Sequence, residues 1–229
     1  MALWASPLAL SPLIPAPLSG HPMQSHAKSS PAALRNRDAI LEVLRTVLTA
    51  DATVLEIASG TGEHASYFAQ QTNWTWQTSD PDPEARASAA AWSHEEALVP
   101  LSLDVTSPTW HSGLDTAYDA IFCANMIHIA PPAATTGLLS GAGQVLSDGQ
   151  RLILYGPFAV GGHHTAQSNA QFDASLKARN SQWGIRDLGA VVEHARQHQL
   201  VHQKTVQMPA NNLTVIFKKT DKPAAALPN

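Results

Sequence analysis

Short runs of apolar residues alternate along residues 30–219 with segments whose apolar positions recur every three or four residues. The first spacing is typical of buried strands and the second of amphipathic helices. The pattern predicts a helix from Ser30-Pro31 to before Asp51, strands at 53–58, 74–79, 98–103, 120–125 and 151–155, and helices at 63–71, 83–92 and 132–146. Such alternation predicts a parallel sheet with helices on both faces.

The chain beyond the fifth predicted strand breaks this rhythm. Residues 156–187 are too long for a plain connection, and Asp187 can begin a further helix. Two β-like runs, 200–208 and 213–218, follow and are joined as in a hairpin. The predicted fold class is therefore α/β and Rossmann-like.

The N-terminal 30 residues differ from the rest in being rich in proline, without a basic residue before Lys28. A secretory signal needs a positive start and an unbroken apolar stretch, so a signal is disfavoured, and no stretch approaches the length of a membrane span. We expect 1–29 to be a disordered extension, unless Met23 is the true start. Residues 30–219 then form one domain with a lid insertion at 156–187, and 220–229 a disordered tail.

Composition limits the classes of function. Apolar residues make up 44% of the 229 residues, enough for one core, and the net charge is −4 without a long basic block. A nucleic-acid substrate is disfavoured because phosphate tracking needs a basic face. The single cysteine, Cys123, cannot form an internal disulfide, which fits a reducing, cytoplasmic location.

Residues 54–65 read VLEIASGTGEHA, an apolar strand that runs into a glycine turn and then a helix. Glycine accepts positive φ and has no Cβ, so such a turn brings backbone against a ligand while the helix directs free N–H groups at it. The carboxylate of Glu56 would repel a pyrophosphate but suits ribose hydroxyls or a cationic amino-acid group. The motif therefore favours S-adenosylmethionine over a dinucleotide.

Acidic residues lie at or near the carboxyl ends of the first three predicted strands. They are Glu56, Asp80 and Asp104. Ligands in parallel sheets bind at these strand ends, and Asp80 follows Gly62 by about one helix and one strand, as a ribose-binding carboxylate does. Asp104 could accept the adenine amino hydrogens. Each residue alone could equally be a solvated strand-end carboxylate, but the three together support a nucleotide-type site.

The chain resembles the class I S-adenosylmethionine-dependent methyltransferases. The segments EIASGTGEHA, WQTSDPDP, NMIHIAPP, LYGPF and MPANNL resemble in particular the methyltransferase-like 26 family, over about residues 28–219. The resemblance implies a seven-stranded sheet whose last strand is antiparallel. It also implies cofactor contacts from Glu56, Ala58, Ser59, Gly60, Gly62, Asp80, Asp104, Val105, Asn125 and Met126.

One departure from the class I pattern is Ala58, which stands where these enzymes commonly have glycine. We expect alanine to be tolerated if the backbone there stays in the β region.

Methyl transfer from a sulfonium requires mainly that nucleophile, methyl and sulfur are held in line. Candidate catalytic residues follow the fourth and fifth predicted strands: Asn125, His128 and Tyr155. His128 could accept a proton at neutral pH, or could equally be packed beside Ile127. The sequence from Asn125 lacks the Asn/Asp-Pro-Pro-aromatic tetrad of amino-methylating DNA enzymes, so nucleobase methylation is not expected.

Residues 156–187 are the predicted lid over the acceptor site. Ser168 and Gln171 have capping-box spacing, which predicts a short helix through Arg179. Polar residues expected to contact the acceptor are His163, His164, Asn169 and Asp173, although a solvated loop is the alternative for each. No metal site is expected, because the pair His194 and His198 lacks an accompanying carboxylate-histidine motif.

The expected activity is methyl transfer to a small molecule or a protein group, and the oligomeric state cannot be deduced. Two alternatives stay open. One is a non-catalytic S-adenosylmethionine-binding module, because fold does not establish function. The other is an NAD-linked oxidoreductase, because 60–65 also satisfies the loose dinucleotide pattern.

Overall fold

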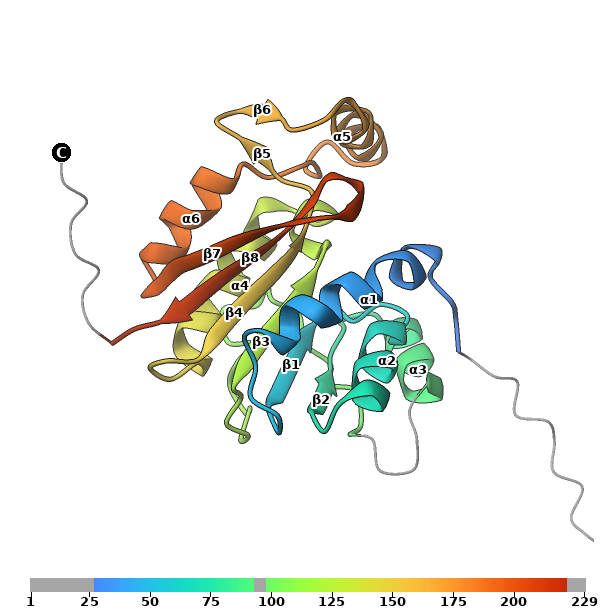
Figure 1. Cartoon of the computed structure of the whole chain (residues 1–229), viewed down its shortest axis with the longest axis vertical. Helices are drawn as coiled ribbons and strands as arrows, with labels where there is room; N and C mark the ends of the chain where they lie inside the picture. The colour runs from blue at the N-terminus through green and yellow to red at the C-terminus, as the bar shows by residue number, and fades with distance from the viewer. Residues whose placement is uncertain (1–26, 93–97, 222–229) are drawn as a thin grey trace, which may run out of the picture.

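The computed structural model describes residues 27–92 and 98–221 and shows a central sheet with helices on both faces (Figure 1). Residues 1–26 of the predicted extension at 1–29 and residues 222–229 of the predicted tail at 220–229 lie outside the described residues. The helices are α1 (Pro31–Arg45), α2 (Glu63–Gln71), α3 (Pro83–Trp92), α4 (Pro132–Val145), α5 (Gln167–Arg179) and α6 (Leu188–Arg196). The strands are β1 (Thr53–Ile57), β2 (Thr75–Thr78), β3 (Ala120–Ala124), β4 (Arg151–Gly156), β5 (Ala159–Val160), β6 (His163–His164), β7 (Leu200–Met208) and β8 (Asn212–Lys219).

Six strands form the main sheet, in the order β2-β1-β3-β4-β8-β7. Strands β2, β1, β3 and β4 are parallel, and β8 runs antiparallel to both β4 and β7. The four parallel strands are almost entirely buried, which explains why they read as apolar runs. The prediction of an α/β Rossmann-like fold with an antiparallel last strand is confirmed.

The predicted strand at 98–103 is the main error. This segment contributes a single bridge, between Ser79 and Leu101, instead of a seventh strand. Leu98 is 42% exposed and Val99 81% exposed, so these apolar side chains do not pack on the sheet. Leu101 and Leu103, further along the run, are only partly buried against the core, so the segment gains little from fuller pairing with the sheet edge beyond β2.

Two clusters of buried side chains hold the layers together. One lies between the sheet and α1 and α2, and includes Ile40, Leu44 and Phe68. The other joins the sheet to α4 and α6, and includes Leu138 and Val191. Among the described residues, no helix combines the length and the apolar character that crossing a membrane requires.

Two glycines of α4 let the segment after residue 98 pack closely. A Cβ at Gly137 would lie 1.8 Å from the carbonyl oxygen of Val105, and one at Gly141 would lie 2.3 Å from the indole of Trp110. The Trp110 indole also donates a hydrogen bond to the Gly137 carbonyl, at 2.9 Å. The spacing of the two glycines places both on one side of the helix. We did not deduce this docking from the sequence.

Replacing Gly137 with alanine should destabilise the fold, because backbone atoms on both sides would have to separate. We expect the free energy of unfolding to fall by at least about 2 kcal/mol, measured by urea denaturation. Ser140→Ala, on the same helix, is the control and should stay within about 0.5 kcal/mol of the wild type. Equal stability of the wild type and Gly137→Ala would show that α4 and Val105 are not in contact.

Candidate functional site

The loop between β1 and α2 has a backbone shape that few sequences accept. Ala58, Gly60 and Gly62 have φ values of 55°, 55° and 81°. A Cβ at Gly62 would lie 2.4 Å from the Cα of Ala89 in α3, so glycine is required there by packing as well as by conformation. A Cβ at Gly60 would meet no atom within 4 Å. The loop therefore packs against the protein at Gly62 and is open at Gly60.

Ala58 corrects one expectation. Its φ of 55° lies in the left-handed region, so the condition under which we expected alanine to be tolerated, a backbone in the β region, is not met. The backbone keeps the conformation that glycine would adopt freely, and the alanine Cβ is strained against it by about 1–2 kcal/mol. Neighbouring hydrogen bonds hold it there, since the Ser59 N–H donates to the Ser79 carbonyl at 2.8 Å.

Asp80 connects the ends of β1 and β2. Its Oδ2 accepts the Gly60 N–H at 3.0 Å, and its Oδ1 accepts the Asp82 N–H at 2.9 Å. The side chain is buried apart from about a tenth of its surface. The carboxylate is thus held against the open part of the glycine loop, where the sequence predicted a ribose-binding group.

Asp104 and Val105 lie on the segment that replaces the expected third strand. Asp104 is exposed, and its Oδ1 accepts hydrogen bonds from the N–H and hydroxyl of Thr106, at 2.9 and 2.7 Å. Val105 is buried against Gly137 of α4. The position of Asp104 is therefore set by its own turn and by α4, rather than by a strand of the sheet.

Glu56 is a carboxyl group in an apolar environment. Its side chain is 1% exposed, and the indole of Trp76 donates to its Oε2 at 3.0 Å. Burial raises the pKa of Glu56 to about 7, against the opposing effect of the hydrogen bonds from Trp76 and Ser59. Glu56 therefore changes its charge close to neutral pH.

A chain of polar side chains leads from Glu56 on β1, by way of α2 and α1, to β4 and the start of β8. The His64 Nδ1 lies 4.0 Å from Glu56, and its Nε2 lies 2.7 Å from the Asn36 Oδ1 of α1. Asn36 also bonds the hydroxyl of Tyr155, which in turn bonds Asn212. Burial lowers the pKa of His64 to about 4, with Arg37 adding to the effect, so the ring is neutral.

We did not predict a role for His64 from the sequence, and for Asn36 we considered only that Arg35-Asn36-Arg37 could help to close the mouth of the acceptor site or form the wet face of a helix. A histidine directly after the glycine turn was the available signal for His64. Nothing in the sequence indicated the bond between Asn36 and His64, because helical periodicity places residues on a face but does not identify the partner of a side chain on another element.

Residues predicted to be catalytic lie at the carboxyl ends of β3 and β4. Asn125 has a φ of 61° and donates its N–H to the Tyr155 carbonyl at 2.7 Å. It precedes a 3₁₀ turn, η1 (Met126–His128), in which all three side chains are buried. Asn125, Met126 and Tyr155 are therefore neighbours, as the predicted topology requires.

His128 is completely buried. Its Nδ1 accepts the Arg186 N–H at 3.2 Å, while its Nε2 is buried without a hydrogen-bond partner in the described residues. Burial lowers the pKa of His128 to about 3, and the nearby Arg186 adds to the effect. A buried neutral imidazole with this pKa is poorly suited to accept a proton from an acceptor molecule.

The predicted lid contains the β5–β6 hairpin and α5. The expected capping box is wrong, because α5 starts at Gln167 and its N-cap, Ala166, makes no side-chain bond. The helix does end at Arg179. His163 and His164 lie in β6, where both are exposed.

Asn169 and Asp173 of α5 are buried and bonded within the protein. The Asn169 amide donates to the Asn211 carbonyl in the β7–β8 turn, at 3.0 Å. The Asp173 carboxylate accepts the Ile185 N–H at 2.7 Å and the Lys177 ammonium at 2.6 Å. The Asn169 bond ties α5 to the turn between β7 and β8, and the Asp173 bonds join α5 to Ile185 within the same predicted lid segment. The pair therefore primarily fixes where α5 lies.

Within residues 27–92 and 98–221, no group of three or more His, Cys, Asp or Glu side chains is placed to hold a metal ion. The rings of His194 and His198 lie 5.5 Å apart. The cofactor-type residues therefore remain the main chemical feature of this edge of the sheet.

The glycine loop, the strand-end carboxylates and the sheet order define the class of the fold as that of class I methyltransferases. The sequence profile of the DUF938 family, described as proteins of unknown function, matches residues 27–219. The chain belongs to this family, which is similar to the methyltransferase-like 26 proteins. The resemblance seen in the sequence is therefore confirmed.

Solved structures support the same fold. A chain of the complex between the Haloferax volcanii Trm112 methyltransferase activator and a putative methyltransferase is 13% identical, with a TM-score of 0.67 over 82% of this chain and 92% of that one. An O-methyltransferase family protein from Burkholderia thailandensis is 14% identical, with a TM-score of 0.66 over 80% of this chain and 58% of that one.

Human N-acetylserotonin methyltransferase, in complex with S-adenosylmethionine, is 14% identical, with a TM-score of 0.63 over 80% of this chain and 55% of that one. The chain thus spans less than two thirds of the length of several of these proteins. At these identities the similarity establishes the fold.

Replacing Ala58 with glycine should stabilise the protein, because it removes the Cβ from a left-handed residue. We expect a gain of about 1 kcal/mol in the free energy of unfolding, measured by urea denaturation. Ala87→Gly, at an exposed position inside α3, is the control and should lose about 1 kcal/mol. A loss in both variants would contradict the left-handed conformation of Ala58.

Glu56 should make stability depend on pH. Between its ordinary value of 4.5 and its raised pKa of about 7, the folded protein holds a proton that the unfolded chain releases. The free energy of unfolding therefore falls through this range as pH rises, by up to about 3 kcal/mol from this group. Glu56→Gln keeps an oxygen for Trp76 and should lack this decrease.

The measurement is urea unfolding of both proteins at about pH 5 and about pH 8. Relative to the wild type, Glu56→Gln should become more stable as the pH rises from about 5 to about 8. His64, whose lowered pKa acts in the opposite sense below 6.5, is present in both proteins and cancels in the comparison. A constant difference between the proteins at the two pH values would refute a raised pKa for Glu56.

Proposed function

We propose that this protein is an S-adenosylmethionine-dependent methyltransferase that acts on a small-molecule or protein acceptor. The observation that carries the proposal is the glycine loop with its open side at Gly60, held beside the Asp80 carboxylate by a direct hydrogen bond. The bound human enzyme with the same fold supports the choice of cofactor.

The residues at the carboxyl edge fit this cofactor chemically. Glycine conformations and the α2 N-terminus leave room and N–H groups near Gly60 for the amino-acid part. The Asp80 carboxylate suits two ribose hydroxyls, and Asp104 suits the adenine amino group. When bound, S-adenosylmethionine supplies a methyl group on a sulfonium, ready for displacement.

Glu56 contributes charge at the methionine end of the proposed site. Its ionised form would attract a cationic amino group, and that attraction in turn would favour ionisation of a carboxyl whose pKa burial has raised to about 7. Cofactor binding and the release of a proton by Glu56 are therefore coupled in this proposal.

The candidate catalytic residues act by positioning. His128 is buried and neutral, and burial raises the pKa of the Tyr155 hydroxyl, which bonds Asn36 and Asn212. Neither group is a good proton acceptor near neutral pH. Asn125 holds the ends of β3 and β4 together through Tyr155. The proposed reaction thus depends on in-line placement of an acceptor whose attacking atom needs no strong base.

The lid supplies the proposed acceptor contacts. Asn169 and Asp173 are occupied in anchoring α5. On the hairpin His163 is exposed, whereas the His164 side chain is 32% exposed and its Nε2 lies 3.4 Å from the Asp173 Oδ2. In this proposal the two histidines meet the acceptor, and Asn169 and Asp173 fix the position from which they do so.

A non-catalytic S-adenosylmethionine-binding module is the second candidate. The burial of His128 and Tyr155 favours it, since neither group offers an accessible base. An NAD-linked oxidoreductase has less support, because Glu56 would face a pyrophosphate.

Isothermal titration calorimetry with S-adenosylmethionine, S-adenosylhomocysteine and NAD tests the cofactor. We expect binding of the first two at micromolar affinity and none of NAD. Asp80→Ala should weaken S-adenosylmethionine binding by about 1–3 kcal/mol, roughly 5–150-fold, because the ribose hydroxyls lose their acceptor.

Asp82→Ala is the matched control for Asp80. Asp82 is exposed and accepts the Glu84 N–H at the start of α3, at 2.9 Å, so its loss should leave cofactor affinity within about twofold. Binding of NAD alone would overturn the proposal. Cofactor binding without methyl transfer to any metabolite or protein extract would favour the non-catalytic module.

A further inference from the structure

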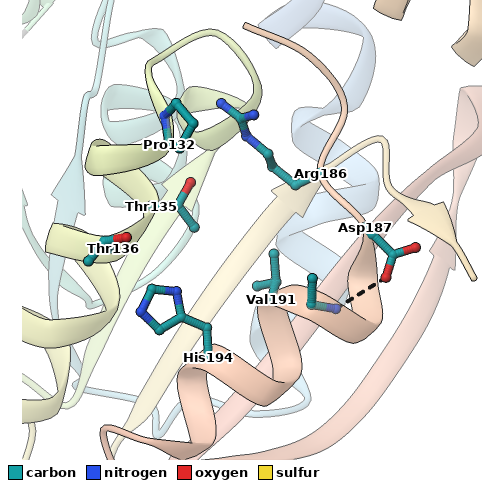
Figure 2. A pocket seen from close by; sticks show the side chains of 8 residues that line it. Pro132, Thr135, Thr136, Arg186, Asp187, Val191 and His194 are labelled. Carbon is teal, nitrogen blue, oxygen red and sulfur yellow. Dashed lines mark hydrogen bonds between the residues drawn. The ribbon is translucent and has the colours of Figure 1, made fainter. Parts of the chain in front are cut away.

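A pocket lies between α4 and α6, apart from the glycine loop (Figure 2). Its volume is about 230 Å³, below the roughly 300–1,000 Å³ of sites for drug-sized ligands. Its lining comes mainly from apolar surface, with contributions from Pro132, Thr135, Thr136, Arg186, Val191 and His194. A pocket of this size fits a small molecule with a short apolar body.

Arg186 brings a positive charge to this pocket that no carboxylate neutralises directly. Its side chain donates to the carbonyls of Ile127 at 2.8 Å, Ala130 at 2.7 Å and Gln182 at 3.1 Å. These partners are neutral, and among the described residues Arg186 forms no ion pair within 4.0 Å. Its Nη1 atom has no hydrogen-bond partner in that part of the chain. A guanidinium in this state favours an anionic ligand.

Thr135 adds a buried polar atom that lacks a partner. The residue is 7% exposed, and its hydroxyl oxygen has no hydrogen-bond partner in the described residues. Figure 2 shows this oxygen turned toward the end of the pocket at which the Arg186 guanidinium lies. An unpartnered buried hydroxyl is costly, and a ligand that reaches it removes the cost.

Asp187 also lines the pocket, and its charge opposes an anion. Both of its oxygens are directed elsewhere, because Oδ1 accepts the Ala190 N–H at 3.1 Å and Oδ2 the Gly162 N–H at 2.8 Å. Figure 2 shows the Asp187 carboxylate pointing away from Thr135 and His194. The chemical character of the ligand is therefore set by the apolar walls and by the charge of Arg186.

We propose that the α4–α6 pocket binds a small aliphatic or monocyclic carboxylate, with its carboxylate against Arg186 and Thr135 and its apolar body against Val191. The site is independent of the cofactor and of methyl transfer. It is nevertheless connected to the β3 end, because Arg186 holds η1 through the Ile127 carbonyl and through His128.

Isovalerate is the probe, and its neutral amide, isovaleramide, is the ligand control. Methyl NMR of the full chain without cofactor should show the Val191 signals shifting with millimolar isovalerate. Isovaleramide should bind at least about tenfold more weakly, since it lacks the charge that Arg186 recognises.

Thr136→Trp fills the pocket from an exposed helix position and leaves Arg186 in place. It should weaken isovalerate binding at least about tenfold, whereas Ala133→Trp, exposed on the same helix but outside the pocket lining, should not. Arg186→Gln should weaken binding to a similar extent, with its fold checked by circular dichroism because Arg186 also supports η1.

The expected pattern is binding to the wild type and to Ala133→Trp, with loss in Thr136→Trp. Undiminished binding to Thr136→Trp, equal binding of acid and amide, or no Val191 shift at millimolar isovalerate would each overturn the proposal. Because no cofactor is present, failure here leaves the methyltransferase proposal untouched.

Discussion

The hydrogen bond from the Gly60 N–H to the Asp80 carboxylate is the contact on which the site depends. It joins a loop with alternating left-handed residues to the end of β2, and so converts a strained backbone into a fixed surface. Gly62, packed against Ala89, anchors the other end of the loop to α3. Strain at Ala58 persists because these contacts, with the hydrogen bond from Ser59 to Ser79, hold the backbone that follows it.

Several polar side chains are buried around this loop, at the edge of the sheet where the strands end. Glu56 is neutral or charged depending on small changes near neutral pH, and His64 and Asn36 extend its environment to α1 and Tyr155. Buried polar groups of this kind reduce stability unless they are satisfied. Their clustering at one edge of the sheet is consistent with a binding site rather than with a purely structural core.

The segment after residue 98 shows how helix packing can replace strand pairing. Gly137 and Gly141 admit the Val105 backbone and the Trp110 ring, and this docking places Asp104 without a seventh strand. The predicted lid is fixed in a similar way, by specific contacts. Asn169 ties α5 to the β7–β8 turn, and Asp173 ties it to Ile185. Both segments are irregular in sequence pattern, yet each is fixed by a few specific contacts.

The sequence by itself determined most of the elements and the edge at which they bring Glu56, Asp80 and Asn125 together, because apolar periodicity and glycine chemistry are local properties. It located the starts of α1, α2 and α3 closely, since their first residues follow local start signals, but α1 ends at Arg45, short of the predicted limit before Asp51. Only the tertiary structure decided that 98–103 does not pair as a strand, that Ala58 is left-handed and that His128 is buried. Those outcomes depend on distant partners, such as Gly137, Ser79 and Arg186, whose positions no local pattern encodes.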